Sequence, residues 1–436
     1  MSPSTTTTPS SLRRRLLALG LGGLLLGGTT GMVLAGDDEQ EKRASTKVEK
    51  IDRAALRSLA AGNLQFAFNF YRAGIHPGEN LVLSPYGISE CFSLLYAGSS
   101  EGTARVLEDL FHYPEAPERI LASFGNLRRH IAGRTNEACR IDIASSCWAD
   151  ERTPVAPGYA RDLESGIDGE IFSVDFSQGE LVQAEMNAWV DENTNGLIKE
   201  APGPVSPADL LVLMNTVCLD AAWEAGFEKS VTKDRPFRLV DGRTVDVPTM
   251  HQERRHRYAA TEDAQIVELP YAGGTTSMLI ILPREGRELS DLEKKLDPAM
   301  LAGWDRTMKT RKVELRLPRF ELASQLDLKQ LLAAMTSTGL FGALDLGRML
   351  EATSVMVTDA SQDAVIKVDE DGTEAAALTT VTLGRSARPT PEAVEVSVDR
   401  PFMYLVRDHA TDTIYFMGRV VDPRGSASES PRSSTP

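Results

Sequence analysis

A polar, basic stretch near the C-terminal end contains the residues of this sequence that are best suited to attack by a protease. Arg385 and Ser386 lie within GRSARP, between Gly384 and Pro389. An arginine side chain fits the acidic specificity pocket of trypsin-like enzymes, so the bond between Arg385 and Ser386 is a candidate cleavage site. The stretch is polar enough to lie in solvent, where a protease can reach it.

The residues that precede this stretch combine features of a strand and of a loop. The apolar pattern of residues 364–368 (AVIKV) predicts a strand, which the charged run 369–371 and Gly372 end. Residues 373–383 (TEAAALTTVTL) are first too small to fill a core and then too rich in threonine and valine for a helix. A connection of this length inside a compact domain is usually functional or disordered, or it indicates that a helix or strand has been assigned wrongly. We interpret it as an exposed loop whose first half can later become a strand.

No motif of an enzyme or of a metal site is present. The sequence lacks GxSxG, HExxH, CxxC and a glycine-rich phosphate loop. His251 and His256 lie in a basic segment, HQERRHR, which is more typical of a solvated loop or strand face than of a metal site. We therefore expect a protein that is not an enzyme, with no metal and no cofactor.

The formal net charge of −15 disfavours nucleic acid and anionic membranes as partners. One basic cluster in residues 128–134 could bind a polyanion, but the overall acidity makes this a weak alternative. It consists of Arg128, Arg129, His130 and Arg134.

The two ends of the chain are predicted to lie outside the fold. Residues 1–35 have a positive start, Arg13–Arg15, an apolar run and a small-residue cleavage site at Ala35, as in a signal peptide. The arginines fit general and twin-arginine export alike. We expect an exported protein, extracellular or periplasmic, with a flexible lead-in over 36–52, a single domain over 53–423 and a disordered tail over 424–436.

Four cysteines, an even number, would permit disulfides in an exported protein. Two of them lie in apolar runs, which favours buried free thiols for all four. They are Cys91, Cys139, Cys147 and Cys218.

Hydrophobic periodicity indicates a mixed fold. It predicts helices over 51–74, 84–95, 102–110 and 186–197. It predicts strands over 141–148, 210–219, 266–269, 277–282, 313–320 and 394–398, and a hairpin formed by 401–407 and 413–420. Helices come first and strands cluster later, which favours an α+β protein with large antiparallel or mixed sheets.

The order of several motifs resembles the serpin family, in an exported, bacterial-type form, from about Leu64 to Pro423. They are ENLVLSPYGIS, NAWVDENTNG, LLVLMNTVCLDAAWEAGF, VELPYAGGTTSMLIILP, DEDGTEAAA and DRPFMYLVRDHATDTIYFMGRVVDP. The resemblance implies an α+β serpin fold with three β-sheets, eight or nine helices and an exposed reactive loop. It also implies a monomer that inhibits serine proteases as a suicide substrate, forming a covalent complex as the cut loop inserts into the largest sheet.

The resemblance assigns roles to residues of the opening stretch. It implies a loop hinge at Glu370, Gly372, Thr373, Glu374, Ala375, Ala376 and Ala377. In most inhibitory members the scissile residue lies fourteen after the hinge glycine, which gives the bond Ser386–Ala387. The chemistry of the side chains favours Arg385–Ser386 instead, and both bonds stand as alternatives.

A cluster that controls opening of the central sheet in the family also has counterparts. Ser84 and Asn215 match it, whereas its second serine falls on Gly87 and its histidine on Gln362. Sheet opening could therefore differ from that of typical members. The alternative function is a non-inhibitory serpin that acts as a binding or carrier protein.

Overall fold

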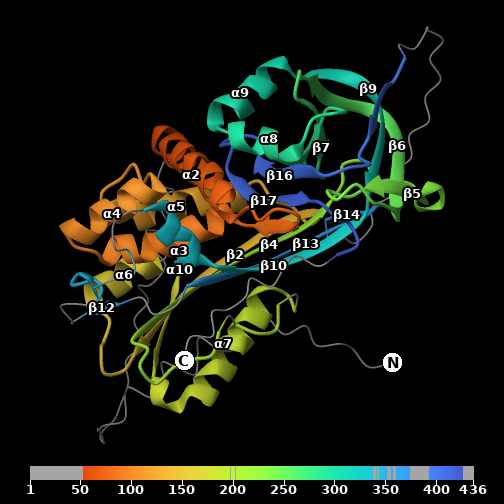
Figure 1. The fold of residues 1–436 in the computed structure, drawn as a ribbon. Helices are drawn as coiled ribbons and strands as arrows, with labels where there is room; N and C mark the ends of the chain where they lie inside the picture. Colours follow the sequence, from red (N-terminus) through yellow and green to blue (C-terminus); the bar gives the residue numbers. More distant parts are fainter. Residues whose placement is uncertain are drawn as a thin grey trace, which may run out of the picture. The chain divides into compact units, whose positions relative to one another are not determined.

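The computed structural model describes residues 53–425, apart from 197, 202, 337–339, 341–342, 351–354, 357–359 and 374–391. These residues form helices and sheets of the α+β class, which confirms the predicted fold class (Figure 1). The helices are α2 (Arg53–Gly74), α3 (Pro85–Gly98), α4 (Glu101–Phe111), α5 (Pro117–Ala132), α6 (Pro157–Ile167), α7 (Gly179–Asn193), α8 (Leu289–Lys295), α9 (Pro298–Thr307) and α10 (Leu328–Met335).

A six-stranded sheet runs through the middle of the molecule and contains the candidate site. In spatial order its strands are β10 (Phe320–Asp327), β13 (Ser361–Val368), β14 (Gly372–Thr373), β4 (Leu211–Ala222), β2 (Cys139–Asp150) and β3 (Glu170–Val174). Neighbours are antiparallel except β2 and β3. Among the described residues, the two-residue strand β14 is the one element between the long strands β13 and β4.

A second sheet contains nine strands. It branches at the 17-residue strand β6, which pairs with three neighbours. Its order is β1 (Leu81–Leu83), β17 (Ile414–Val420), β16 (Phe402–Asp408), β8 (Thr276–Pro283), β7 (Ala264–Pro270), β6 (Thr244–Ala260), β9 (Lys309–Pro318) and β15 (Val394–Ser397), with β5 (Lys233–Arg238) beside β6. A small sheet pairs β11 (Ala343–Leu344) with β12 (Val355–Met356).

Helices cover the two faces of the six-stranded sheet unequally (Figure 1). On one face α3 packs on β4 within the main apolar core, and α2, α5 and α6 extend that layer. On the other face lies α7, whose Met186 and Trp189 pack with Trp148 of β2 in a separate apolar cluster. Both faces of the sheet therefore carry packed helices.

Most predicted elements are present in the structure, with some boundaries changed. The helix predicted over 84–95 is α3, which begins at Pro85 because Ser84 caps it: its Oγ accepts a hydrogen bond from the Gly87 amide at 3.2 Å. The helix predicted over 186–197 begins earlier, at Gly179, and ends at Asn193. The strand predicted over 313–320 is wrong at its end, because Pro318 closes β9 and Phe320 begins β10 in the other sheet.

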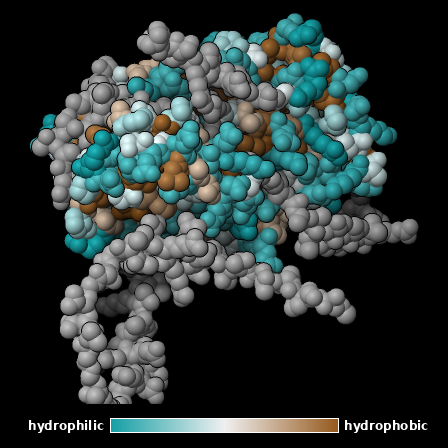
Figure 2. All heavy atoms as spheres, turned by 90° about the horizontal axis from the view of Figure 1, so that it is seen from below, coloured by the Kyte–Doolittle hydropathy of each residue, from teal (hydrophilic) through white to brown (hydrophobic). Residues whose placement is uncertain are grey.

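The described surface seen in Figure 2 is mainly hydrophilic, with scattered hydrophobic areas. Leu181 and Val240 are the large apolar side chains that stand exposed in the described ranges. Within those ranges no helix is both long and apolar enough to cross a bilayer.

Candidate functional site

The hinge of the predicted reactive loop forms a short strand inside the six-stranded sheet. In β14, Gly372 lies opposite Ala222 and Thr373 opposite Ala221 of β4, and on its other side Thr373 lies opposite Val368 of β13. The chain thus turns back after β13 and enters the space between β13 and β4. These two residues are the last described before the loop.

Gly372 is required at this position because the backbones approach closely. A Cβ atom at Gly372 would lie 2.1 Å from the carbonyl oxygen of Ala221 and 2.8 Å from the Cα of Ala222. Both are backbone atoms of β4, so no side-chain rotation could relieve the overlap. Any other residue here would force the hinge away from the sheet.

The turn from β13 into β14 is held by backbone hydrogen bonds to the segment after β4. The amides of Trp223 and Phe227 donate to the carbonyls of Asp371 and Glu370, each at 2.9 Å, and the indole Nε1 of Trp223 donates to the carbonyl of Asp369 at 2.9 Å. Lys229 pairs with the Asp371 carboxylate at 2.5 Å. This part of the hinge is therefore fixed on several sides.

Glu370 anchors the same turn through its buried carboxylate. Its Oε1 accepts hydrogen bonds from Nε and Nη2 of Arg319, at 2.8 and 2.5 Å, and from the Thr232 hydroxyl. Burial alone would raise the pKa of Glu370, but the hydrogen bonds from Arg319 and Thr232 outweigh it and hold that pKa below its ordinary value. The carboxylate is therefore ionised and paired at neutral pH.

Thr373 is buried, and its hydroxyl lies 2.6 Å from the Tyr271 hydroxyl. The Tyr271 ring in turn stacks on Trp223, with centroids 4.6 Å apart and planes 7° from parallel. The first side chain of the hinge strand is thus buried beside aromatic rings, and it also lines the space between β4 and β13.

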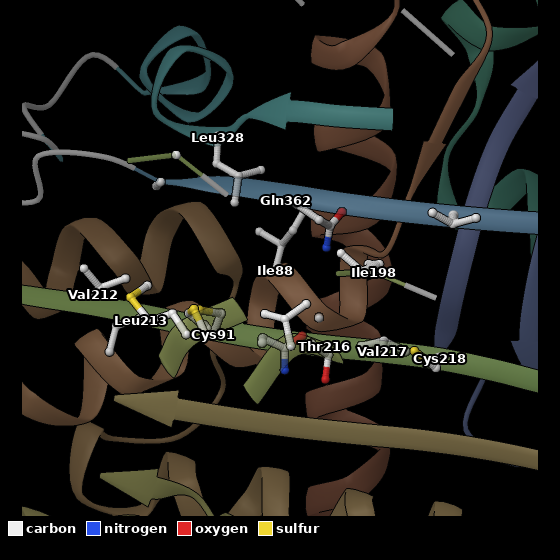
Figure 3. Close-up of a pocket in the computed structure, with 18 of the residues that line it drawn as sticks. Ile88, Cys91, Ile198, Val212, Leu213, Thr216, Val217, Cys218, Leu328 and Gln362 are labelled. Atoms are coloured by element: carbon white, nitrogen blue, oxygen red, sulfur yellow. The ribbon is translucent and has the colours of Figure 1, made fainter. Parts of the chain in front are cut away.

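Below this two-residue strand, β13 and β4 separate and enclose a cavity (Figure 3). Its volume is about 120 Å³, and it is lined by residues of β4, such as Val217, and of β13, such as Ile366. Ile88 and Cys91 of α3 close it from one side, and Met186 of α7 also lines it. The space continues the line of β14, between two strands whose facing edges are unpaired with each other in the described register.

Of the predicted sheet-opening residues, Asn215 lines this cavity together with Gly87 and Gln362, and Ser84 is hydrogen-bonded to Gln362. The Gln362 side chain bridges to Ser84, accepting from its amide at 2.9 Å and donating to its carbonyl at 3.0 Å, so it ties β13 to the start of α3. Asn215 of β4 instead donates to the neighbouring strand β2, to the Ala144 carbonyl at 3.2 Å and to the Ser145 hydroxyl at 3.0 Å. A Cβ at Gly87 would lie 2.5 Å from Asn215 Oδ1. Ser84, Gly87, Asn215 and Gln362 therefore lie near one another, with Gln362 where the family has a histidine.

Most side chains of the basic cluster in residues 128–134 contact carboxylates of the protein itself. Arg128 forms an ion pair with the fully buried Glu90 of α3, and it donates to the Ser145 hydroxyl at 2.7 Å. Arg134 lies 3.5 Å and His130 4.0 Å from the Asp408 carboxylate. Three of the four side chains therefore face the protein's own carboxylates, whereas Arg129 is exposed, and polyanion binding stays a weak alternative.

The structure also describes the four cysteines and the two histidines of the segment HQERRHR. All four cysteines are free, and all but the partly buried Cys91 are fully buried, as expected. In the described ranges no three or more His, Cys, Asp or Glu side chains are grouped so that they could hold a metal ion. His251 and His256 both lie on β6, but His256 is buried rather than solvated.

Several predictions fall on residues that the structure leaves undescribed. These are the scissile-bond residues Arg385, Ser386 and Ala387, and the hinge residues Glu374, Ala375, Ala376 and Ala377. The signal peptide, the lead-in and nearly all of the tail also lie outside the described residues. All of them stay predictions.

The geometry agrees with what comparisons with known proteins find. Residues 61–423 match the family model described as Serpin (serine protease inhibitor). The chain belongs to the serpin family. Since serpins are protease inhibitors, this membership confirms that the chain is not an enzyme.

Relatives and solved structures of other serpins align over most of the chain. An uncharacterized serpin-like protein of Thermococcus kodakarensis is 30% identical, over 89% of this chain and 91% of its own. Antithrombin-III of Mus musculus is also 30% identical, over 88% and 86%. The structure of thyroxine-binding globulin in complex with thyroxine superimposes with a TM-score of 0.75 and 25% identity, over 84% of this chain and 99% of its own.

Two important residues of this serpin's hinge site were missed by the sequence analysis. Arg319 is far from Glu370 in sequence, and no local pattern connects the two. Tyr271 lies within the family-like run VELPYAGG, but only the fold brings it to Thr373. A buried glutamate next to the loop hinge could have signalled that a cation had to be nearby.

Proposed function

We propose that this serpin is an exported suicide-substrate inhibitor of trypsin-like serine proteases. The observation that carries the proposal is β14: the first two hinge residues pair with both β4 and β13 above an open space between those strands. A strand that continued beyond Thr373 would enter the gap between β4 and β13, and this supports the proposal.

The mechanism follows from that arrangement. The serine hydroxyl of the protease attacks the scissile carbonyl, the peptide bond breaks, and the new amino terminus leaves while an ester joins the two proteins. The freed segment that follows Thr373 then lengthens β14, so that a full strand lies between β4 and β13. The protease, held by the ester, is carried along and distorted before water can hydrolyse the ester.

Energetics favour this movement. Inserting about a dozen residues adds ladder hydrogen bonds worth about 1 kcal/mol net each, on the order of 10 kcal/mol in all. This is comparable to the whole stability of a typical domain. Small side chains at alternate positions, Thr373, Ala375, Ala377 and Thr379, share one face of the new strand and let it enter without steric resistance.

The direct test is incubation with trypsin, followed by SDS gel electrophoresis and mass spectrometry of the released C-terminal peptide. We expect a complex that survives SDS and heat, with a peptide that begins at Ser386, or at Ala387 if the alternative bond is cut. If only free, cleaved protein appears at every ratio of protease to inhibitor, the proposal fails.

A binding or carrier function is the second candidate. The observation in its favour is the structural likeness to thyroxine-binding globulin, whose structure contains thyroxine. A carrier would be cut by trypsin without forming a stable complex. The same gel therefore separates the two functions.

A further inference from the structure

One side chain of the basic cluster, Arg128 of α5, is largely buried and contacts three other elements. Its Nε forms the ion pair with the fully buried Glu90 of α3, and its Nη2 donates to the Ser145 hydroxyl of β2 at 2.7 Å. Its Nη1 donates to the carbonyl of Ile167, the last residue of α6, at 2.7 Å. We call Glu90, Arg128 and Ser145 the clasp. The inhibitory mechanism described above gives these three residues no role.

The clasp contains a buried ion pair, which is an inefficient way to stabilise a fold. Taking two charges out of water costs about as much as their attraction returns, so apolar residues of similar size often stabilise a core equally well. A buried pair can instead fix one arrangement of packed elements. The arrangement that this pair fixes is the position of β2 relative to α3.

The clasp reaches the gap between β4 and β13 through the pairing of β2 with β4. Ser145 lies directly opposite Asn215 of β4, and its hydroxyl also accepts from Asn215 Nδ2 at 3.0 Å. Asn215 in turn lines the cavity. The two strands pair continuously from Cys139 to Ala149 of β2, so we expect them to move together.

On the other side of the gap, β13 is tied to the same helix. The Gln362 side chain bonds to the backbone of Ser84 at the start of α3. Helix α3 is held in the main apolar core, where it packs on α2 and on β17 of the second sheet. The strands that border the gap are thus linked to one helix, β13 through Gln362 and β4 through β2 and the clasp.

Insertion of a strand must strain these links. Neighbouring strands lie about 4.8 Å apart, so β4 and β13 must separate by about that distance where a new strand enters between them. A hydrogen bond does not survive a displacement of that size. If α3 keeps its place, either Gln362 leaves Ser84 or Ser145 leaves Arg128.

We propose that Arg128, oriented by Glu90, is a positioning residue that holds β2 and β4 close to α3 and slows the opening of the gap. The inference rests on the proposed function, because the gap matters only if a strand enters it. The ion pair lies outside the predicted sheet-opening residues Ser84 and Asn215, and it adds a restraint that comes from α5.

The test measures the entry of a strand into the gap without a protease. The probe is a fluorescent synthetic peptide with the sequence of residues 373–384, TEAAALTTVTLG, and the rise of its fluorescence anisotropy gives the rate of uptake. The variant Ser145→Ala removes the acceptor on β2 and keeps the ion pair. The matched control is Ser146→Ala, the next residue on β2, whose buried hydroxyl accepts from Nε1 of Trp148 at 2.9 Å instead of from Arg128.

A second variant separates positioning from stability. Glu90→Leu/Arg128→Met replaces the ion pair by apolar groups, so its melting temperature should equal or exceed that of the wild type. We expect this variant and Ser145→Ala to take up the peptide at least about tenfold faster than the wild type, and Ser146→Ala to take it up at the wild-type rate. Faster uptake by a variant that is no less stable cannot come from a general loosening of the fold.

Equal rates in the wild type, Ser145→Ala and the double variant would overturn the proposal, and so would equal acceleration in Ser145→Ala and Ser146→Ala. No uptake by any of these proteins would refute the proposed function together with the clasp, because the gap would then take no strand. Faster uptake by the variants, with no stable complex between the wild type and trypsin, would support the clasp and refute only the inhibitory function.

Discussion

Replacing Thr373 by arginine should turn the proposed inhibitor into a substrate. The Thr373 side chain is 3% exposed and its hydroxyl lies 2.6 Å from that of Tyr271, in a site without an acidic partner among the described contacts. A guanidinium placed there would be a buried, unpaired charge, which costs about 3–5 kcal/mol. The hinge would therefore remain outside the sheet.

That cost falls on the first step of insertion and so acts on its rate. At about 1.4 kcal/mol per factor of ten, insertion should slow by roughly 100-fold to several thousand-fold. Insertion competes with hydrolysis of the acyl-enzyme, so most molecules should then be cut and released. Cleavage itself should be unaffected, because the predicted scissile bond is more than ten residues away.

The assay is the stoichiometry of inhibition, the number of serpin molecules consumed per trypsin molecule inactivated. It should rise steeply in Thr373→Arg, with cleaved protein replacing the SDS-stable complex. The matched control is Thr373→Val, which keeps the shape and loses only the contact with Tyr271, worth about 1 kcal/mol. A Thr373→Arg variant that forms as much stable complex as the wild type would refute the account of the hinge.

Three further predictions concern the hinge and the thiols. Glu370→Gln should lower stability by about 1–3 kcal/mol at pH 7, since a charge-assisted contact with Arg319 is lost. The folded-state pKa of Glu370 lies below the ordinary 4.5, so the ionised carboxylate stabilises the fold fully above that pH. The difference in melting temperature between the wild type and Glu370→Gln should therefore shrink as the pH falls below 4.5. A difference that stays constant with pH would contradict this. Gly372→Ala should break β14 and speed amide exchange around residues 369–373 by about tenfold or more, whereas Gly102→Ala, at a site with open space around it, should leave exchange there unchanged. Burial raises the pKa of the Cys91 and Cys147 thiols to about 12 and that of Cys139 to about 11, so a thiol reagent at pH 8 should leave the native protein unmodified and count four thiols after denaturation; a count of two would indicate a disulfide.

The sequence predicts those elements whose pattern is local. Helix α3 is recognisable because Ser84 and Pro85 provide its cap and first turn. Strands β7 and β8 are recognisable as short apolar runs. By contrast, β6 was not among the predicted strands, because its buried face includes Gln252 and His256 and gives no apolar alternation.

The candidate site was only partly predictable for a similar reason. Motif order points to Gly372 and to Ser84 and Asn215, but a strand of two residues has no pattern of its own. Strand β14 exists only because β4 and β13 pair with it from both sides. The anchoring of Glu370 by Arg319 and the bridge from Gln362 to Ser84 are likewise products of tertiary packing.

The most direct test of loop insertion compares the thermal unfolding of intact protein with that of protein cut once within the reactive loop. If the cut segment fills the space between β4 and β13, the gain on the order of 10 kcal/mol should raise the melting temperature by more than about 10 °C. A cleaved protein that melts at or below the temperature of the intact one would contradict insertion, and with it the proposed inhibitory mechanism.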